Sequence, residues 1–400
     1  MNLRFWKQFL ENYKTACILI VNTALLLVLS WFAINGMLLV LFHAWDHHLR
    51  MHNSVAQRYG GVVQEAYPDL TQAEIDDLIR ETWDRPNRFM NDRFTGPRER
   101  PYTGRYVNID PHGFRRTRLQ GDWPPDPRFF NIFVFGGSTA FGYGVPDDGT
   151  IASWLGASFE HSAWRDRVRV YNFGRGGYYS TSERILFEQL LTAGTVPRMA
   201  IFIDGLNEFG CFADDKRGTD VMDELLRDKR AFLVREGIRD FVITEPVKRL
   251  ADSFRTGVLG WWLRGKKPPP PDVPINDSEA KFVVDRYLAN KKLIEAIARA
   301  YGVQPLFVWQ PIPFYNYDLT YHRMGQLNPH RESQLGYRVA APILKDKPLG
   351  KDFFWCADLQ AGLRGGLYVD SIHYSSRMCR LIADSIFGFL TKTAWLPNAT

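Results

Sequence analysis

Two short segments, far apart in the chain, hold residue types that together can carry out nucleophilic chemistry. Ser138 lies in a Gly-Gly-Ser-Thr turn directly after the apolar run 129–135, and Asp370 precedes His373 by three positions. A serine hydroxyl becomes a good nucleophile when a base removes its proton, and an imidazole oriented by a carboxylate is such a base. We therefore expect Ser138, His373 and Asp370 to form a catalytic triad, although more than 230 positions separate the serine from the other two.

The elements that must bring these residues together alternate between strand and helix patterns from residue 129 onward. Strands are expected at 129–135, 168–173, 199–203 and 304–309, and helices at 151–159, 182–193, 280–301 and 376–391. Such alternation predicts a three-layer α/β/α sandwich with a parallel sheet. Ligand sites in such sheets lie outside the carboxyl ends of the strands, where Ser138, the glycines at 174–177 and Asn207 are expected.

An attacked ester also develops a negative oxygen, which needs hydrogen-bond donors. The candidate donors are the backbone N–H of Ser138, the backbone N–H of a glycine within 174–177, and the side-chain amide of Asn207. The turn at 136–139 lacks the Gly-Lys-Ser/Thr ending of a phosphate-binding loop. The chemistry expected here needs no metal ion and no organic cofactor.

In their order along the chain, these segments resemble the SGNH, or GDSL-like, hydrolase superfamily. The matching blocks are 135–139, 172–177, 205–208 and 370–373, and the first three follow expected strands. The resemblance implies an SGNH or flavodoxin-like fold over about 129–393, with Ser138 as nucleophile. It also implies an oxyanion hole made by Ser138, Gly177 and Asn207. Gly177 is preferred to Gly174 because the family's oxyanion glycine lies five positions after the asparagine of the second block.

Two positions depart from the family pattern. Gly137 stands where the family has aspartate before the serine, and Glu208 stands where the third block usually ends in aspartate. Both positions support the site rather than attack the substrate, so we expect a divergent member. Asp204, at a strand end, is expected to be structural. Glu183 and Glu188, on the expected helix 182–193, are expected to be solvated or packing residues. Gln310 and Pro311 are expected to line the pocket.

A long apolar segment precedes this expected domain. Residues 16–42 contain no charged residue, and at about 1.5 Å per residue a helix of this length exceeds the roughly 30 Å hydrocarbon core of a bilayer. A cleaved signal peptide would have a shorter apolar region and a small-residue cleavage site. Arg4, Lys7 and Lys14 outweigh Glu11 on the N-terminal side. The positive-inside rule therefore predicts a cytoplasmic N-terminus and a periplasmic or lumenal domain.

The chain divides into four parts by composition. Residues 1–14 are expected to be a cytoplasmic tail, 15–43 a transmembrane helix, 44–128 a stalk and irregular arm, and 129–393 the SGNH-like domain with an insertion at 209–280. In the stalk, Thr71 and Glu74 form a capping-box signal for a helix. In the insertion, Trp261 and Trp262 lie beside cations, a pattern that fits a lid, a contact with the membrane interface or a surface helix.

Charge and cysteine content limit the partners and the cross-links. The net charge of +6 is spread without a basic stripe, which argues against nucleic-acid binding. Of the four cysteines, Cys17 lies in the apolar segment. Cys211, Cys356 and Cys379 allow three alternative disulfides, among which the sequence does not choose.

Together these features favour a membrane-anchored, extracytoplasmic serine esterase. It would remove acyl groups, such as acetyl, from an envelope glycan or lipid through an acyl-enzyme on Ser138, with the substrate, the membrane and envelope proteins as partners. The substrate class follows from location and family resemblance. One alternative is an O-acyltransferase that uses the same triad on a cell-surface polysaccharide. Another is a non-catalytic envelope scaffold or glycan-binding subunit.

Overall fold

The computed structural model describes residues 3–49, 55, 59–85, 88–92, 94–210, 275–327, 330–347, 349–393 and 395–397. The chain splits into two compact units, one made of Met1–Met51 with Gly218–Val273 and the other of His52–Arg217 with Pro274–Thr400. The paired tryptophans of the expected insertion and Cys211 lie outside the described residues.

In the first unit, α1 (Leu3–Leu49) is one continuous helix. Its segment Trp6–Leu41 contains an 18-residue stretch with a mean hydropathy of 2.4, so by length and composition it could cross a membrane. The expected tail at 1–14 belongs to the same helix from Leu3 onward, because Leu3–Lys14 contains no glycine or proline that would end it.

In the second unit, the described residues contain a five-stranded parallel sheet with the order β6-β5-β7-β8-β9. The strands are β5 (Phe130–Gly136), β6 (Val168–Asn172), β7 (Met199–Asp204), β8 (Gln304–Trp309) and β9 (Phe353–Trp355). This is the flavodoxin-like strand order. The chain adds β6 on one side of β5 and then adds β7, β8 and β9 on the other side, so the switch point lies between β5 and β7. Ligands bind at such a switch point. The predicted α/β fold is confirmed. The four expected strands lie within one residue of their predicted ends, whereas the three-residue β9 was not predicted.

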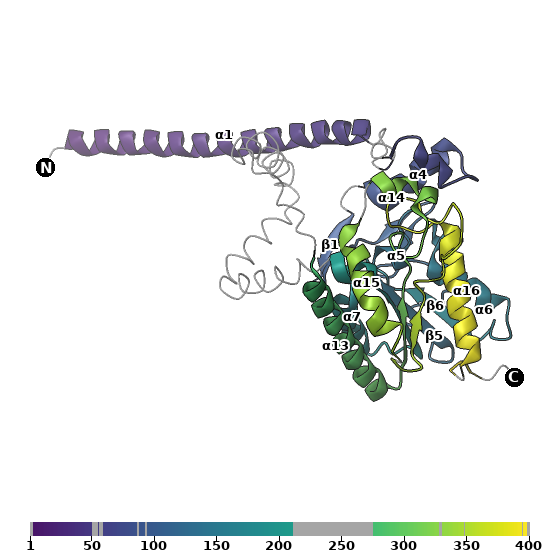
Figure 1. Cartoon of the computed structure of the whole chain (residues 1–400). Coiled ribbons are helices and arrows are strands. Elements are labelled where there is room, and N and C mark those ends of the chain that lie inside the picture. The colour runs from purple at the N-terminus through teal and green to yellow at the C-terminus, as the bar shows by residue number, and fades with distance from the viewer. Residues whose placement is uncertain are drawn as a thin grey trace. The chain divides into compact units, whose positions relative to one another are not determined.

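Side chains alternate across the sheet and build a core on each face. From β5, Ile132 and Val134 pack beneath α6 (Ile151–Glu160) and α16 (Ser376–Lys392). Phe133 and Phe135 point the other way, into a core shared with helices α7 and α13. These span Ser180–Thr192 and Asp277–Tyr301. Figure 1 shows the sheet between these two helix pairs, with α15 (Arg331–Leu344) beside α13.

The segment expected as a stalk is instead packed against the domain. Its helices are α3 (Val62–Glu65), α4 (Gln72–Ile79) and the π-helical η1 (Arg80–Asp84). Thr71 and Glu74 form the predicted capping box of α4. The helically spaced Ile75, Leu78 and Ile79 are fully buried in a cluster that also contains Val369. An apolar stripe of this kind needs a partner surface, and the residue before Asp370 supplies part of it.

The arm that follows forms short antiparallel strands, and its Arg115 donates hydrogen bonds to the segment just after the Ser138 turn. Its strands are β1 (Phe89–Asp92), β2 (Gly96–Glu99), β3 (Tyr102–Thr103) and β4 (Asn108–Ile109). Arg115 is fully buried, and its guanidinium donates to the carbonyls of Phe141 at 3.0 Å and Val145 at 2.7 Å. A third bond reaches the Asp147 carboxylate at 2.8 Å. The described residues also form the short helices α5 (Ser138–Phe141), η2 (Asp147–Gly149), α8 (Leu206–Gly210), η3 (Leu319–Tyr321) and α14 (Arg323–Leu327).

The structure excludes one of the three alternative disulfides. Among the described cysteines, Cys356 and Cys379 are both buried and both free, so they do not pair with each other. Burial raises the pKa of each thiol to about 12. Both therefore stay protonated and behave as small apolar core residues.

Candidate active site

Ser138, His373 and Asp370 meet at the carboxyl end of the sheet. His373 Nε2 lies 2.9 Å from Ser138 Oγ, and His373 Nδ1 lies 2.7 Å from Asp370 Oδ2. Each of the three residues is only 8% exposed. The structure thus brings the three predicted triad residues into one hydrogen-bonded line, across 235 positions of sequence.

Asp370 is held as an ionised acceptor. Its Oδ1 accepts the backbone N–H groups of Ile372 at 2.8 Å and His373 at 2.7 Å, which leaves Oδ2 for the imidazole. Burial alone would raise the pKa of Asp370, but the His373 charge and these hydrogen bonds together lower it below its usual value. A carboxylate fixed in this way selects the tautomer in which Nδ1 carries the proton, and Nε2 is then free to accept one from Ser138.

Two glycines allow the sharp turn that presents Ser138. Gly136 ends β5 with φ of +155°, and a Cβ there would collide with Ala140 and touch the Ile203 carbonyl. Ser138 then opens α5, so its N–H is among the first helical amides, which lack an acceptor within the helix. The turn therefore places both the hydroxyl and the N–H of Ser138 at the switch point.

Asn207 lies directly beside this turn. It sits on α8, just after β7, and its Nδ2 donates to the Tyr178 carbonyl at 2.7 Å. A Cβ on Gly137 would collide with this same Nδ2. The Asn207 amide therefore fills the space where the side chain of residue 137 would stand. Because an amide nitrogen carries two hydrogens, one remains for another acceptor.

The two candidate oxyanion glycines have different surroundings. The Gly174 N–H donates to Asn172 Oδ1 at 2.9 Å, and a Cβ on Gly174 would collide with Phe141 N. Gly177 has φ of +77°, is exposed, and has open space around the Cβ position. Since its amide already donates to Asn172, Gly174 is a poor donor for a substrate.

Two aromatic rings outside the predicted site pack against His373. The Trp83 ring lies edge-on to the imidazole with centroids 5.8 Å apart, and the Tyr143 ring lies 5.4 Å away. Tyr143 O–H donates to the buried Glu99, which also pairs with Arg85. Sequence reasoning missed both rings. Trp83 falls in the segment expected to be a stalk. The only signal that this segment packs against the domain is the helical apolar spacing of α4, immediately before Trp83.

Gln310 lies beneath the triad rather than lining a pocket. It is 1% exposed, and its Oε1 accepts hydrogen bonds from Thr139 Oγ at 2.7 Å and Tyr374 O–H at 3.0 Å. These donors are the neighbours of Ser138 and His373. The expected pocket-lining role is therefore not what the structure shows: Gln310 connects the two segments that carry the nucleophile and the base.

A buried acidic cluster lies behind Asn207. Glu208 accepts the Ser180 N–H at 2.6 Å and a hydrogen bond from Arg286 at 3.3 Å. Burial raises its pKa, and Arg286 opposes the rise. Glu183 and Asp204 are buried nearby, and as ionised groups neither has a hydrogen-bond partner among the described residues. Burial first, then neighbouring carboxylates, raise the pKa of both, so a proton shared between them is the favoured state.

The described residues contain no group of three His, Cys, Asp or Glu side chains that could hold a metal ion. The arrangement that they do contain is a serine nucleophile, an oriented base and nearby donors at the switch point of a parallel sheet. These features define an α/β protein with the site geometry of a serine hydrolase.

Comparison with known proteins gives distant structural similarity. No protein-family model matches the sequence, and no curated protein matches it. The similar solved structures include the esterase EstA from Pseudoalteromonas sp., at 12% identity over 66% of this chain and 97% of that one, with a TM-score of 0.31. A lipase from a goat rumen metagenome is 8% identical over 65% and 97%, with a TM-score of 0.37.

A protein from Desulfitobacterium hafniense, assigned to the G-D-S-L lipolytic family, is 12% identical over 65% of this chain and 99% of that one, with a TM-score of 0.34. The family that the four sequence blocks resemble thus occurs among the similar structures. At these identities and TM-scores the likeness carries no argument about mechanism or substrate, which must come from the site itself.

Proposed function

We propose that this chain is a membrane-anchored serine esterase that acts outside the cytoplasm through an acyl-enzyme on Ser138. The observation that carries the proposal is the buried line from Ser138 Oγ through His373 to Asp370, at 2.9 and 2.7 Å. Hydrogen bonds of this length allow a proton to move from serine to imidazole as the serine attacks.

In the first half of the reaction, Ser138 Oγ bonds to the ester carbonyl carbon while His373 Nε2 takes its proton. The resulting imidazolium is stabilised by the ionised Asp370. The tetrahedral intermediate then breaks its bond to the alkoxy oxygen, which leaves as an alcohol with the proton from Nε2. In the second half, water attacks the acyl-enzyme, His373 accepts its proton, and the acid departs as Ser138 regains its hydrogen.

The negative oxygen of both intermediates needs donors, which we assign to the N–H of Ser138, the N–H of Gly177 and the Asn207 amide. The site supports this assignment because Asn207 Nδ2 lies against the Gly137–Ser138 turn. Open space lies beside Gly177, at the position that a Cβ atom would occupy. Removal of one such donor from a serine hydrolase costs about 10²–10³ in kcat.

The location of the reaction follows from α1 and its flanks. A helix long and apolar enough to span a membrane lies near the N-terminus, and cations outnumber anions in its first turns, before the uncharged run 16–42. The positive-inside rule then puts the esterase unit outside the cytoplasm. An enzyme tethered there meets envelope components, so we propose an O-acylated glycan or a lipid as its substrate, with acetyl as one candidate acyl group.

The proposal is tested with a serine-reactive fluorophosphonate probe on the full chain in detergent. The wild type should be labelled, and Ser138→Ala should not. Ser158→Ala, which changes a serine on α6, is the matched control and should label like the wild type. Equal labelling of the wild type and Ser138→Ala would overturn the assignment. Acid released from an acylated glycan without any added acceptor would favour hydrolysis over transfer.

A further inference from the structure

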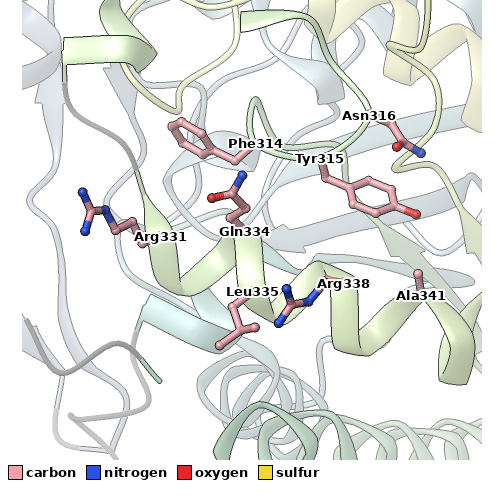
Figure 2. Close-up of a pocket in the computed structure, with 8 residues that line it drawn as sticks. All are labelled: Phe314, Tyr315, Asn316, Arg331, Gln334, Leu335, Arg338 and Ala341. Atoms are coloured by element: carbon pink, nitrogen blue, oxygen red, sulfur yellow. The ribbon is translucent and has the colours of Figure 1, made fainter. Parts of the chain in front are cut away.

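A concavity lies between α15 and the loop that follows β8. It has a volume of about 620 Å³ and contains none of the triad residues. The lining residues are Phe314, Tyr315, Asn316, Arg331, Gln334, Leu335, Arg338 and Ala341. Figure 2 shows Phe314 and Arg331 toward one end, Tyr315 and Asn316 toward the other, and Gln334 and Arg338 between them. We call this concavity the α15 groove.

Two of its polar side chains have unused hydrogen-bonding capacity. Arg331 and Gln334 are exposed, and neither side chain makes a hydrogen bond or an ion pair with the residues that the structure describes. Arg338 is also largely exposed and contacts Asp277 at 3.2 Å across the surface. Exposed pairs of this kind are weak and easily exchanged for another anion. The groove therefore offers several donors and two cations to a ligand.

Asp358, an acidic residue beside the groove, does not cancel this charge. Asp358 accepts from Asn316 at 2.5 Å and pairs with Lys345 at 3.0 Å. It also accepts from the Trp355 indole at 2.8 Å. These bonds occupy both of its oxygens and bring a cation of their own. Arg331 is thus left without a carboxylate partner among the described residues.

Aromatic rings give the groove an apolar wall as well. Tyr315 packs against Tyr337 and Trp355 with centroids 5.6 and 5.9 Å away, which fixes the orientation of its ring. Phe314 is mostly buried and adds a smaller surface. Fixed aromatic faces beside arginine and amide donors fit a ligand that has both apolar and polar sides.

We propose that the α15 groove binds a carboxylate-bearing oligosaccharide. A sugar ring presents apolar C–H groups to an aromatic face and hydroxyls to amide donors, and a uronic-acid carboxylate matches the planar fork of a guanidinium. An anionic bilayer surface is a poorer fit, because membranes select clusters of several protruding basic residues rather than a concave site with aromatic walls.

The groove is connected to the triad by one short loop. Gln310 contacts Thr139 and Tyr374, and the groove begins only four residues later, at Phe314. Even a fully extended segment of this length spans only about 14 Å. A polymer held in the α15 groove could therefore present a neighbouring acylated sugar to Ser138. This role as a substrate subsite rests on the proposed esterase function, whereas the binding itself does not.

The test uses isothermal titration of the full-length Ser138→Ala chain in detergent with a hexamer of galacturonic acid. Binding is expected, and the double variant Arg331→Gln, Gln334→Ala should bind at least about tenfold more weakly, because it loses a charge-assisted bond and an amide contact. Arg299→Gln removes an exposed arginine from α13 and should leave the affinity unchanged.

Three outcomes would overturn the proposal: equal affinity in the double variant, equal affinity for a neutral glucose hexamer, or binding only to phosphatidylglycerol vesicles. If fluorophosphonate labelling fails while the hexamer binds through Arg331, the esterase function falls and the groove remains. If labelling succeeds and hexamer binding fails, the groove proposal falls and the esterase function remains.

Discussion

Trp83 lies edge-on to His373, with ring centroids 5.8 Å apart and ring planes at 73°. Asp370 fixes the imidazole through one nitrogen, and Trp83 together with Tyr143 limits its rotation through packing. Trp83 also packs closely against Gly144, where a Cβ would collide with Val369 and come within 2.6 Å of the indole. The segment that follows α1 in sequence thus contributes a wall of the site.

Replacing Trp83 should impair the chemical step more than substrate binding. Trp83→Ala leaves space beside His373, and a base displaced by about 1 Å can cost up to roughly 100-fold in rate. We expect kcat for p-nitrophenyl acetate to fall by roughly 10- to 100-fold with KM little changed, and Trp83→Phe to restore much of the rate. A rise in KM alone would show that Trp83 contacts substrate instead of positioning His373.

Asp370→Asn should reduce kcat by about 10⁴-fold, the loss seen when a triad carboxylate is replaced, because the imidazole loses its preferred tautomer.

The same variant tests how the free energy of unfolding depends on pH. The lowered pKa of Asp370 contributes stability above the pKa of an unfolded aspartate, about 4, and this contribution is lost as the pH falls through the folded value. The free energies of unfolding of the wild type and the variant, measured in urea, should therefore draw closer as the pH falls below about 4. A constant difference from pH 3 to pH 7 would contradict this account.

Gly137→Asp, which introduces the residue usual in the family, should lower activity rather than raise it. The new Cβ would collide with Asn207 Nδ2 and push that amide from the Ser138 turn. We expect a loss of at least about 10²-fold in kcat, similar to removal of an oxyanion donor. Gly388→Ala, at an α16 position with open space, is the control and should retain full activity.

The buried Glu183–Asp204 pair should make the fold less stable as the pH rises. Burial and the neighbouring Glu208 raise the pKa of both groups. Above about pH 4 the unfolded chain releases protons that the folded chain keeps, so the free energy of unfolding decreases with pH. Arg286 and Tyr287 face the same cluster, but Arg286 is bonded to Glu208.

Asp204→Asn removes one of these carboxyls and should flatten this decrease. The measurement is urea unfolding at several pH values between 5 and 8 for the wild type, Asp204→Asn and the exposed control Asp384→Asn. Parallel curves for the wild type and Asp204→Asn would show that the pair does not hold an extra proton in the folded state.

Local patterns in the sequence were sufficient for part of this structure. Ser138 and Asn207 each follow a strand whose apolar run is visible in the sequence, and parallel topology brings such positions to one edge. The aromatic wall was not predictable in this way. Trp83 and Tyr143 reach His373 through packing between distant segments, and no period or motif specifies that contact. Glu183 is buried beside Asp204 of β7 and Glu208 of α8, and its position on a predicted helix does not specify these neighbours.

The site also has a consequence for synthesis of the chain. Trp83 comes from the N-terminal third, whereas Asp370 and His373 come from the last thirty-one residues. Because these contacts are so non-local, the site should assemble late in folding. A nascent chain would therefore lack a complete triad until the segment through His373 had been synthesised and folded against the rest of the unit.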